Sequence, residues 1–103
     1  MHVPGRYFVY ITTNQHRTVL YVGITNNAVI RAAQHQQDAV HDGRHFAGWY
    51  QAFYVVWYEI FTDVNLAIKR EKELKGWRRS KKLALVHSVN PEMRFLNDEL
   101  LMN

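Results

Sequence analysis

The stretch RYFVYITTNQHRTVLYVGI, residues 6–24, combines two β-rich segments with a short polar segment between them. Residues 6–13 and 18–24 are rich in β-branched and aromatic side chains, which favour strands. Residues 14–17 are polar throughout and suit a turn. The pattern is typical of a β-hairpin, and this hairpin decides the fold.

The length of the turn predicts which residues of the two strands face each other. If four residues form the loop, Thr13 closes onto Thr18 and Tyr10 faces Tyr21. Directly opposed side chains of an antiparallel pair lie on the same side of the sheet. We therefore expect the two phenols to lie together on one face.

After the hairpin, the sequence predicts a helix and then a third strand. Residues 28–38 (AVIRAAQHQQD) contain good helix formers, and Asn26-Asn27 supplies a cap before them. Residues 53–61 (FYVVWYEIF) are the most strongly strand-like segment. We expect this strand to be central in the sheet because its apolar residues are continuous.

Two further helices complete the predicted fold. Asp63 is expected to cap a helix over residues 64–75, and Ser80 to cap a helix over residues 81–87. The tail that follows either packs or frays. The element order is ββαβαα, and the fold class is α/β (α+β), a small antiparallel or mixed sheet covered by helices.

Composition is that of one globular domain. The chain has 103 residues, 48% of them hydrophobic, which fits a single domain over residues 1–103. It has no cysteine, which excludes a disulfide framework and a thiolate metal site. The start lacks a secretory signal, and the longest apolar run, residues 53–58, is far shorter than the roughly 20 residues that span a bilayer. We expect a cytoplasmic location and no membrane contact.

One acid of the helix predicted over residues 64–75 falls on its apolar face. Glu71 follows Val64, Ala67 and Ile68 at helical spacing, whereas cations occupy the remaining surface. Burial of an unpaired carboxylate costs several kcal/mol, so Glu71 requires a partner. An ion pair with a buried arginine and a bound metal ion are both open.

The helix predicted over residues 28–38 carries two further polar groups. Arg31 and His35 are four residues apart and share one face with Ala28 and Ala32. The small alanines let this helix approach the sheet closely, which directs Arg31 toward its surroundings. An arginine bonded to a carboxylate or a solvated pair is the alternative, and His35 alone fits an ordinary imidazole equally well.

Several motifs stand in the order and at the distances of one known family. They are Val9-Tyr10-Ile11; Tyr21-Val22-Gly23; Arg31 with His35; AIKREKELKGW, residues 67–77, with Ser80-Lys81-Lys82; and Asn90-Pro91-Glu92. Together they resemble the GIY-YIG nuclease family, in particular its small stand-alone bacterial members. The resemblance covers about residues 6–96 and implies a compact α/β domain with a three-stranded antiparallel sheet.

This resemblance implies a metal-dependent endonuclease that hydrolyses phosphodiester bonds in structured, damaged or single-stranded DNA, with RNA not excluded. It implies one divalent ion, Mg²⁺ or Mn²⁺, bound by Glu71, and no small organic cofactor. It also implies Arg31 as the phosphate clamp and Tyr10, Tyr21 and His35 as the surrounding catalytic groups. The oligomeric state stays open.

The chemistry of these groups is consistent with that role. Mg²⁺ prefers oxygen ligands and keeps several waters, so one carboxylate and substrate oxygens suffice to hold it. An arginine pairs bidentately with a phosphate as its charge grows. Tyr10 or Tyr21 can take a proton from the attacking water if a nearby cation favours its phenolate. Two packed core tyrosines are the alternative.

The residues expected to contact nucleic acid are of three kinds. Gly23 lets the backbone or the substrate come close, or simply permits a bulge, and Trp49 is suited to stacking on an unpaired base. The net charge of +4 mildly favours a polyanion, although it also aids solubility. The cations expected to bind, which otherwise form a solvated basic turn, are Lys75, Arg78, Arg79, Lys81 and Lys82.

Fewer cations surround the predicted site than in the family pattern, since Ile30 precedes Arg31 and glutamines flank His35. Each neutralised phosphate adds to affinity, so this loss weakens binding. A catalytically weak or inactive nucleic-acid-binding module with the same fold is therefore the alternative. A protein-interaction domain that uses the aromatic segment 46–50 is the third reading.

Overall fold

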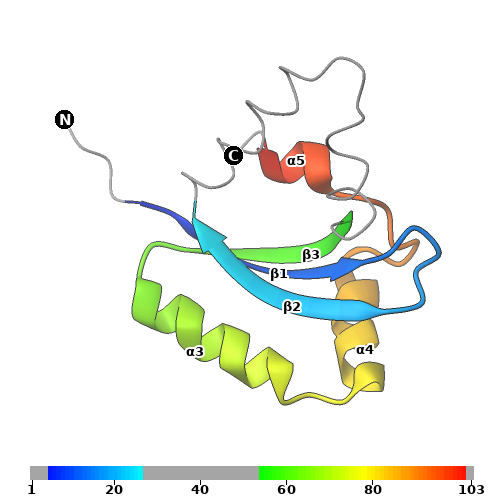
Figure 1. Ribbon diagram of the computed structural model, residues 1–103, viewed down its shortest axis with the longest axis horizontal. Helices are drawn as coiled ribbons and strands as arrows, with labels where there is room; N and C mark the ends of the chain where they lie inside the picture. The colour runs from blue at the N-terminus through cyan, green and yellow to red at the C-terminus, as the bar shows by residue number, and fades with distance from the viewer. Residues whose placement is uncertain (1–4, 27–53, 102–103) are drawn as a thin grey trace.

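The computed structural model describes residues 5–26 and 54–101 of the chain. The helix predicted over residues 28–38, with Arg31 and His35, lies outside this part. Trp49 and the aromatic segment around it lie outside it too. The described elements are β1 (Tyr7–Thr13), β2 (Leu20–Asn26), β3 (Tyr54–Phe61), α3 (Val64–Lys75), α4 (Arg79–Val89) and α5 (Asn97–Leu101) (Figure 1).

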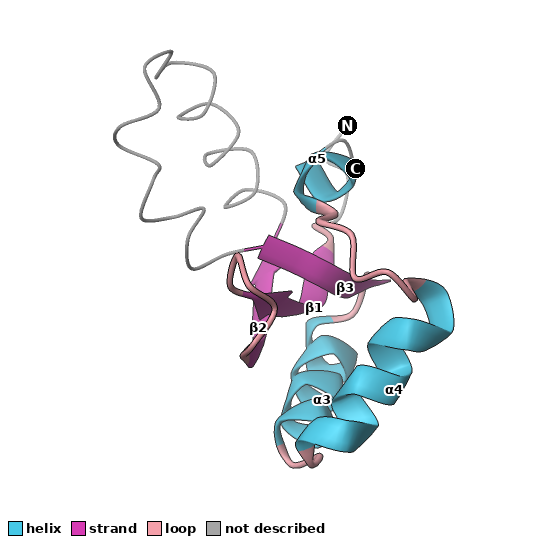
Figure 2. Ribbon diagram, turned by 90° about the vertical axis from the view of Figure 1, so that its right-hand side faces the viewer, coloured by secondary structure: helices cyan, strands magenta, loops and turns pink. Residues whose placement is uncertain are grey.

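The three strands form one antiparallel sheet in the order β2-β1-β3. Helices α3 and α4 lie on one side of it and α5 lies on the other (Figure 2). We call these sides the α3 face and the α5 face. The predicted class, a small three-stranded antiparallel sheet flanked by helices, is confirmed. Within the described ranges, no helix is both long and apolar enough to cross a membrane.

Alternation along β1 divides its side chains between two apolar clusters. On the α3 face, Val9 and Ile11 pack in one cluster with Ala67 and Leu74 of α3. On the α5 face, Phe8 belongs to a second cluster that includes a leucine of α5. Phe8, Val9 and Ile11 are all fully buried, so β1 is covered on both sides.

The hairpin loop is longer than predicted. Thr13 faces Leu20 instead of Thr18, and residues 14–19 form the connection. The cause is Asn14, whose side-chain oxygen accepts a hydrogen bond from the backbone N–H of Thr18 at 2.7 Å. That bond draws Thr18 into the loop, so it cannot pair with the first strand.

The longer loop shifts the register by two residues and corrects the predicted pairing of Tyr10 with Tyr21. Tyr10 faces Gly23, and Tyr21 faces Thr12. Side chains alternate with a period of two along a strand, so a shift of two residues keeps each side chain on its face. The two phenols therefore still share one side of the sheet, the α5 face.

The strand predicted to be central, β3, lies at an edge of the sheet, and β1 is central instead. Val55 packs in the cluster of the α5 face, whereas Val56 and Trp57 pack in that of the α3 face. A strand covered on two sides has continuous apolar sequence wherever it lies in the sheet. The continuous apolar sequence of β3 therefore reflects packing on both of its faces. Trp57 is a core residue.

Helix α3 begins where the sequence predicts, because Asp63 Oδ1 accepts a hydrogen bond from the Asn65 N–H at 2.8 Å. Helix α4 begins at Arg79, earlier than predicted. Ser80 is therefore inside the helix and does not cap it. Arg78 takes the cap position, and its carbonyl accepts hydrogen bonds from the N–H groups of Lys81 and Lys82. Its side chain makes no capping hydrogen bond.

The C-terminal segment packs along the outer edge of β3. The Leu96 N–H donates to the Val55 carbonyl at 2.7 Å, and the Val55 N–H donates to Asn97 Oδ1 at 2.9 Å. Asn90 Nδ2 donates to the Val56 carbonyl at 2.9 Å. These bonds satisfy backbone groups that an edge strand otherwise leaves unpaired.

Substitution of Asn90 by alanine should destabilise the fold by about 2–4 kcal/mol, because it leaves buried backbone groups without partners. Asn90 is 3% exposed, and its amide also bonds both backbone groups of Arg94. The measurement is urea unfolding, in which the midpoint should fall with little change in slope. Replacement of the exposed Ser88 by alanine is the control and should change stability by less than about 0.5 kcal/mol. Equal stability of the two variants would contradict this role of Asn90.

Candidate functional site

The side chain of Tyr10 crosses the sheet over Gly23. Gly23 lies opposite Tyr10 in the register, and a Cβ added to Gly23 would lie 2.4 Å from the Tyr10 hydroxyl oxygen and 2.5 Å from Cζ. Both distances are far below van der Waals contact. Only glycine therefore leaves room for the phenol in this position.

Glu71 lies near this phenol. Its side chain is 14% exposed, and Oε2 lies 2.7 Å from Lys75 Nζ. Burial raises the pKa of the Tyr10 phenol and is the largest effect. Two smaller effects come from the positive charge of Lys75, which lowers this pKa, and from the negative charge of Glu71, which raises it. The structure thus places Tyr10 over Gly23, pairs Glu71 with Lys75 on α3, and leaves both of these charges close enough to act on the pKa of the phenol.

Tyr21 has a different environment from Tyr10. Its side chain is 59% exposed, so the packed-core alternative does not hold for Tyr21. It shares the α5 face with Tyr10 and pairs with Thr12, whose hydroxyl donates to the Tyr21 carbonyl at 3.5 Å. One phenol of the pair is half-buried and the other is open to solvent.

Arg70, the arginine of α3, pairs with acids other than Glu71. Arg70 Nε lies 3.0 Å from Glu59 Oε1, and Arg70 also pairs with Glu73. Its guanidinium lies between the rings of Trp57 and Trp77, at 5.8 and 5.5 Å from their centroids. Arg70 links α3 to β3. Among the described residues, Lys75 is the cation that contacts Glu71.

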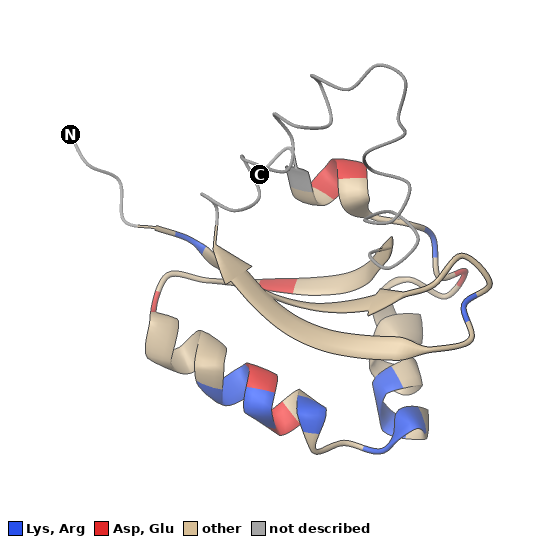
Figure 3. Ribbon diagram, in the orientation of Figure 1, with Lys and Arg blue, Asp and Glu red and all other residues tan. Residues whose placement is uncertain are grey.

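Positive charge is concentrated in residues 69–82, which we call the basic segment. It contains eight of the 13 lysines and arginines of the chain and two of the nine acids. Its formal net charge is +6, whereas the rest of the chain carries −2. The cations line α3 and the first turns of α4 (Figure 3).

Exposure within the basic segment favours contact with a partner. Arg78, Arg79 and Lys81 are exposed and Lys82 is half-buried. Lys81 Nζ lies 4.2 Å above the centroid of the Trp77 ring, which orients the ammonium. Lys69 and Lys72 of α3 are also exposed, although the sequence did not predict them as binding residues.

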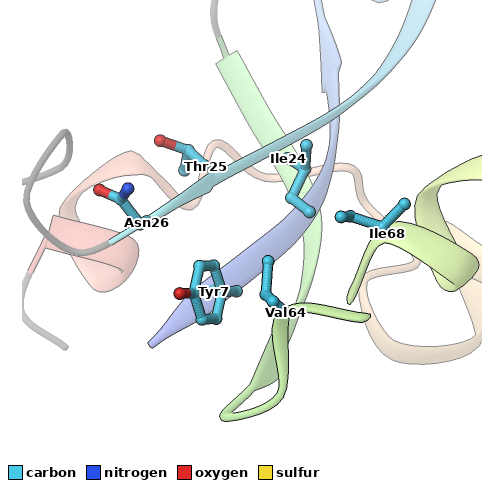
Figure 4. A pocket seen from close by; sticks show the side chains of 6 residues that line it. All are labelled: Tyr7, Ile24, Thr25, Asn26, Val64 and Ile68. Carbon is cyan, nitrogen blue, oxygen red and sulfur yellow. The ribbon is translucent and has the colours of Figure 1, made fainter. Parts of the chain in front are cut away.

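An apolar pocket of about 330 Å³ lies on the α3 face, where β2 ends and α3 begins. Val64 and Ile68 reach toward Tyr7 and Ile24 there, which accounts for their 37% and 38% exposure on the otherwise buried stripe of α3 (Figure 4). Of the predicted site residues within ranges 5–26 and 54–101, none lines this pocket. The candidate site is therefore the Tyr10 and Glu71 region, not the pocket.

The oxygen donors of the site suit one kind of metal ion. Residues 5–26 and 54–101 contain no group of three or more histidines, cysteines or carboxylates placed to hold an ion. A zinc site of ordinary composition is thus not formed by these residues. A single, mostly buried carboxylate fits Mg²⁺ or Mn²⁺, which keep several waters as ligands.

Comparison with known protein families identifies most of this chain. The family model described as GIY-YIG catalytic domain matches residues 6–84, about three-quarters of the chain. No curated protein and no solved structure gives a significant match. The matched range contains all five residues predicted to be catalytic, and it extends from β1 into α4.

Proposed function

The chain belongs to the GIY-YIG catalytic domain family of nucleases, and on that premise we propose that it is a metal-dependent endonuclease that hydrolyses phosphodiester bonds in DNA. The observation that carries the proposal is the mostly buried carboxylate of Glu71 on α3. The Tyr10 phenol passes over Gly23, and the charge of Glu71 acts on it. A phenol and a carboxylate from distant parts of the chain are groups that hydrolysis of a phosphodiester can use.

Glu71 is the residue that would hold a divalent ion. When bound, Mg²⁺ or Mn²⁺ polarises the phosphoryl group and stabilises the charge of the leaving oxygen. The carboxylate is mostly buried on a helix that is fixed by the buried Ala67 and Leu74, so its position is well determined. Such fixed placement is what a catalytic ligand requires.

Tyr10 and Tyr21 are the two candidates for the general base. The raised pKa of Tyr10 keeps its phenol protonated at neutral pH unless a cation is close. Lys75 lowers that pKa, and the guanidinium of Arg31, our proposed phosphate clamp, would supply a second cation. His35 completes the proposed set of catalytic groups.

The proposed substrate is DNA, with RNA open, and the basic segment is the proposed contact surface. Phosphates bound by lysine and arginine release counterions, which makes affinity fall as salt rises. The basic segment begins on α3, the helix that carries Glu71, so its cations extend from the site along the protein surface. We propose contacts from Lys75, Arg78, Arg79, Lys81, Lys82 and Trp49, with the backbone of Gly23 close to the substrate.

Removal of two cations of this surface should weaken DNA binding in a salt-dependent way. For Arg78→Gln with Arg79→Gln, we expect the slope of log affinity against log salt to fall in magnitude by about 2. The measurement is fluorescence anisotropy with a labelled oligonucleotide over a range of salt. The matched control is Arg6→Gln, an exposed cation outside the basic segment, which should leave the slope nearly unchanged. Equal slopes for both variants would exclude this surface.

A nucleic-acid-binding module without useful catalysis is the second candidate. It is favoured by the Lys75 ion pair, which neutralises the carboxylate that the nuclease needs. The two functions differ in a nicking assay with Mg²⁺ or Mn²⁺ on branched, damaged and single-stranded DNA. Metal-dependent nicking supports the nuclease, and salt-sensitive binding with no cleavage of any of these forms supports the module.

A further inference from the structure

Lys75 contacts the carboxylate at the centre of the site. The ion pair joins Lys75 Nζ to Glu71 Oε2 at 2.7 Å, four residues apart on α3 with the acid nearer the N-terminus, which is the favourable order. The two partners differ in exposure, since the Lys75 side chain is 56% exposed and that of Glu71 is 14% exposed. Both charges also act on the pKa of the Tyr10 phenol.

We propose that Lys75 and a divalent metal ion compete for the Glu71 carboxylate, so that Lys75 is a positioning residue that sets the metal affinity of the site. This inference rests on the proposed function, in which Glu71 is the metal ligand. It adds a role for Lys75 that is distinct from contact with a DNA phosphate.

The competition follows from the geometry of the pair. An ammonium at 2.7 Å occupies one carboxylate oxygen, and a divalent ion at the same oxygen would meet a like charge at close range. Repulsion between the two cations therefore disfavours their simultaneous binding to this carboxylate. Glu71 cannot turn away easily, because it is mostly buried on a helix anchored by Leu74.

Lys75 is the partner that can move. Its ammonium is carried on a flexible four-carbon stem, and more than half of the side chain is already in solvent. An ion pair with one exposed partner contributes little net stability, so its loss on metal binding costs little. A metal ion can therefore replace the Lys75 ammonium at Glu71 without any rearrangement of α3.

The test is Mn²⁺ binding to the full chain, followed by the electron paramagnetic resonance signal of free Mn²⁺. Lys75→Met removes the charge and keeps the stem, and we expect about three- to tenfold tighter Mn²⁺ binding than in the unchanged protein. Lys72→Met is the matched control, because Lys72 is an exposed lysine of the same helix. It should change the affinity by less than about twofold, since an exposed charge is screened.

Glu71→Gln separates failure of this inference from failure of the proposed function. If Glu71→Gln abolishes Mn²⁺ binding and Lys75→Met binds no more tightly than Lys72→Met, competition by Lys75 is overturned and the metal site stands. If Mn²⁺ binding is undetectable in every variant, or is unchanged by Glu71→Gln, the metal site itself is overturned and the competition with it. Tighter binding in Lys75→Met alone, lost again on adding Glu71→Gln, supports the inference.

Discussion

Substitution of Glu71 by glutamine should lower the rate of metal-dependent DNA cleavage by about 10³-fold or more. A bound metal ion supplies several kcal/mol of transition-state stabilisation, and each 1.36 kcal/mol corresponds to about tenfold in rate. Glutamine keeps the size of the side chain but is a poor ligand for a hard cation. The measurement is single-turnover cleavage of a labelled substrate at saturating Mg²⁺.

The fold and the binding of DNA should survive this change. Glu71 pairs with an exposed lysine, and loss of such a pair costs less than about 1 kcal/mol. DNA affinity without metal should be equal or slightly higher, because the variant carries one negative charge fewer. The matched control is Glu73→Gln, on the same helix and 52% exposed, which should retain most of the activity. Cleavage by Glu71→Gln at the normal rate would remove Glu71 from the mechanism.

Substitution of Gly23 by alanine should lower the cleavage rate by about 10²-fold, since even a displacement of about 1 Å in a catalytic group has an effect of that size. The added Cβ cannot occupy a point 2.4 Å from the Tyr10 hydroxyl, so the phenol has to move. The overpacking should cost about 1–3 kcal/mol of stability. Cleavage assays and thermal unfolding of the same preparations measure the two effects.

Two further variants show whether the loss arises through Tyr10. Gly76→Ala is the matched control, because a Cβ there would lie at an ordinary 3.5 Å from its nearest neighbour, and it should retain activity. Tyr10→Phe removes the hydroxyl directly, and its combination with Gly23→Ala should lose little more activity than either change alone. A fully active Gly23→Ala protein would show that the position of Tyr10 is not needed for cleavage.

Much of the sheet could be predicted from local sequence. The β-branched and aromatic runs identified all three strands, and Asp63 correctly marked the start of α3. These features depend on residues close together in the chain. The hairpin register could not be predicted in the same way, because it depends on whether the side chain of Asn14 captures Thr18 for the loop.

The place of β3 in the sheet was predicted wrongly for a different reason. The continuous apolar sequence of β3 arises because other elements pack on both of its faces. These elements are α3 and α4 on one side and the C-terminal segment on the other. The short helix α5 and its contacts are separated from β3 by more than 30 residues. Hydrophobic periodicity within a strand carries no information on such distant partners.

The candidate site was predictable in part. Helical spacing placed Glu71 on the buried side of α3, and its 14% exposure agrees with that prediction. The partner of Glu71 was not predicted, because Lys75 and Arg70 are both within reach of α3 acids. Tertiary contacts decide between them, since Arg70 is held by Glu59 of β3. The roles of Arg31 and His35, which lie outside the described residues, stay predictions.

The bonds that the C-terminal segment makes to β3 have a consequence for solubility. A bare strand edge is a template on which another molecule can add a strand, and many proteins guard against this with charged or proline-containing edge strands. β3 (YVVWYEIF) has neither lysine nor proline, and most of its residues are apolar. At this edge, the backbone of Val55 is instead hydrogen-bonded to Leu96 and Asn97. Leu96 and Asn97 therefore cover part of an edge on which another molecule could otherwise add a strand.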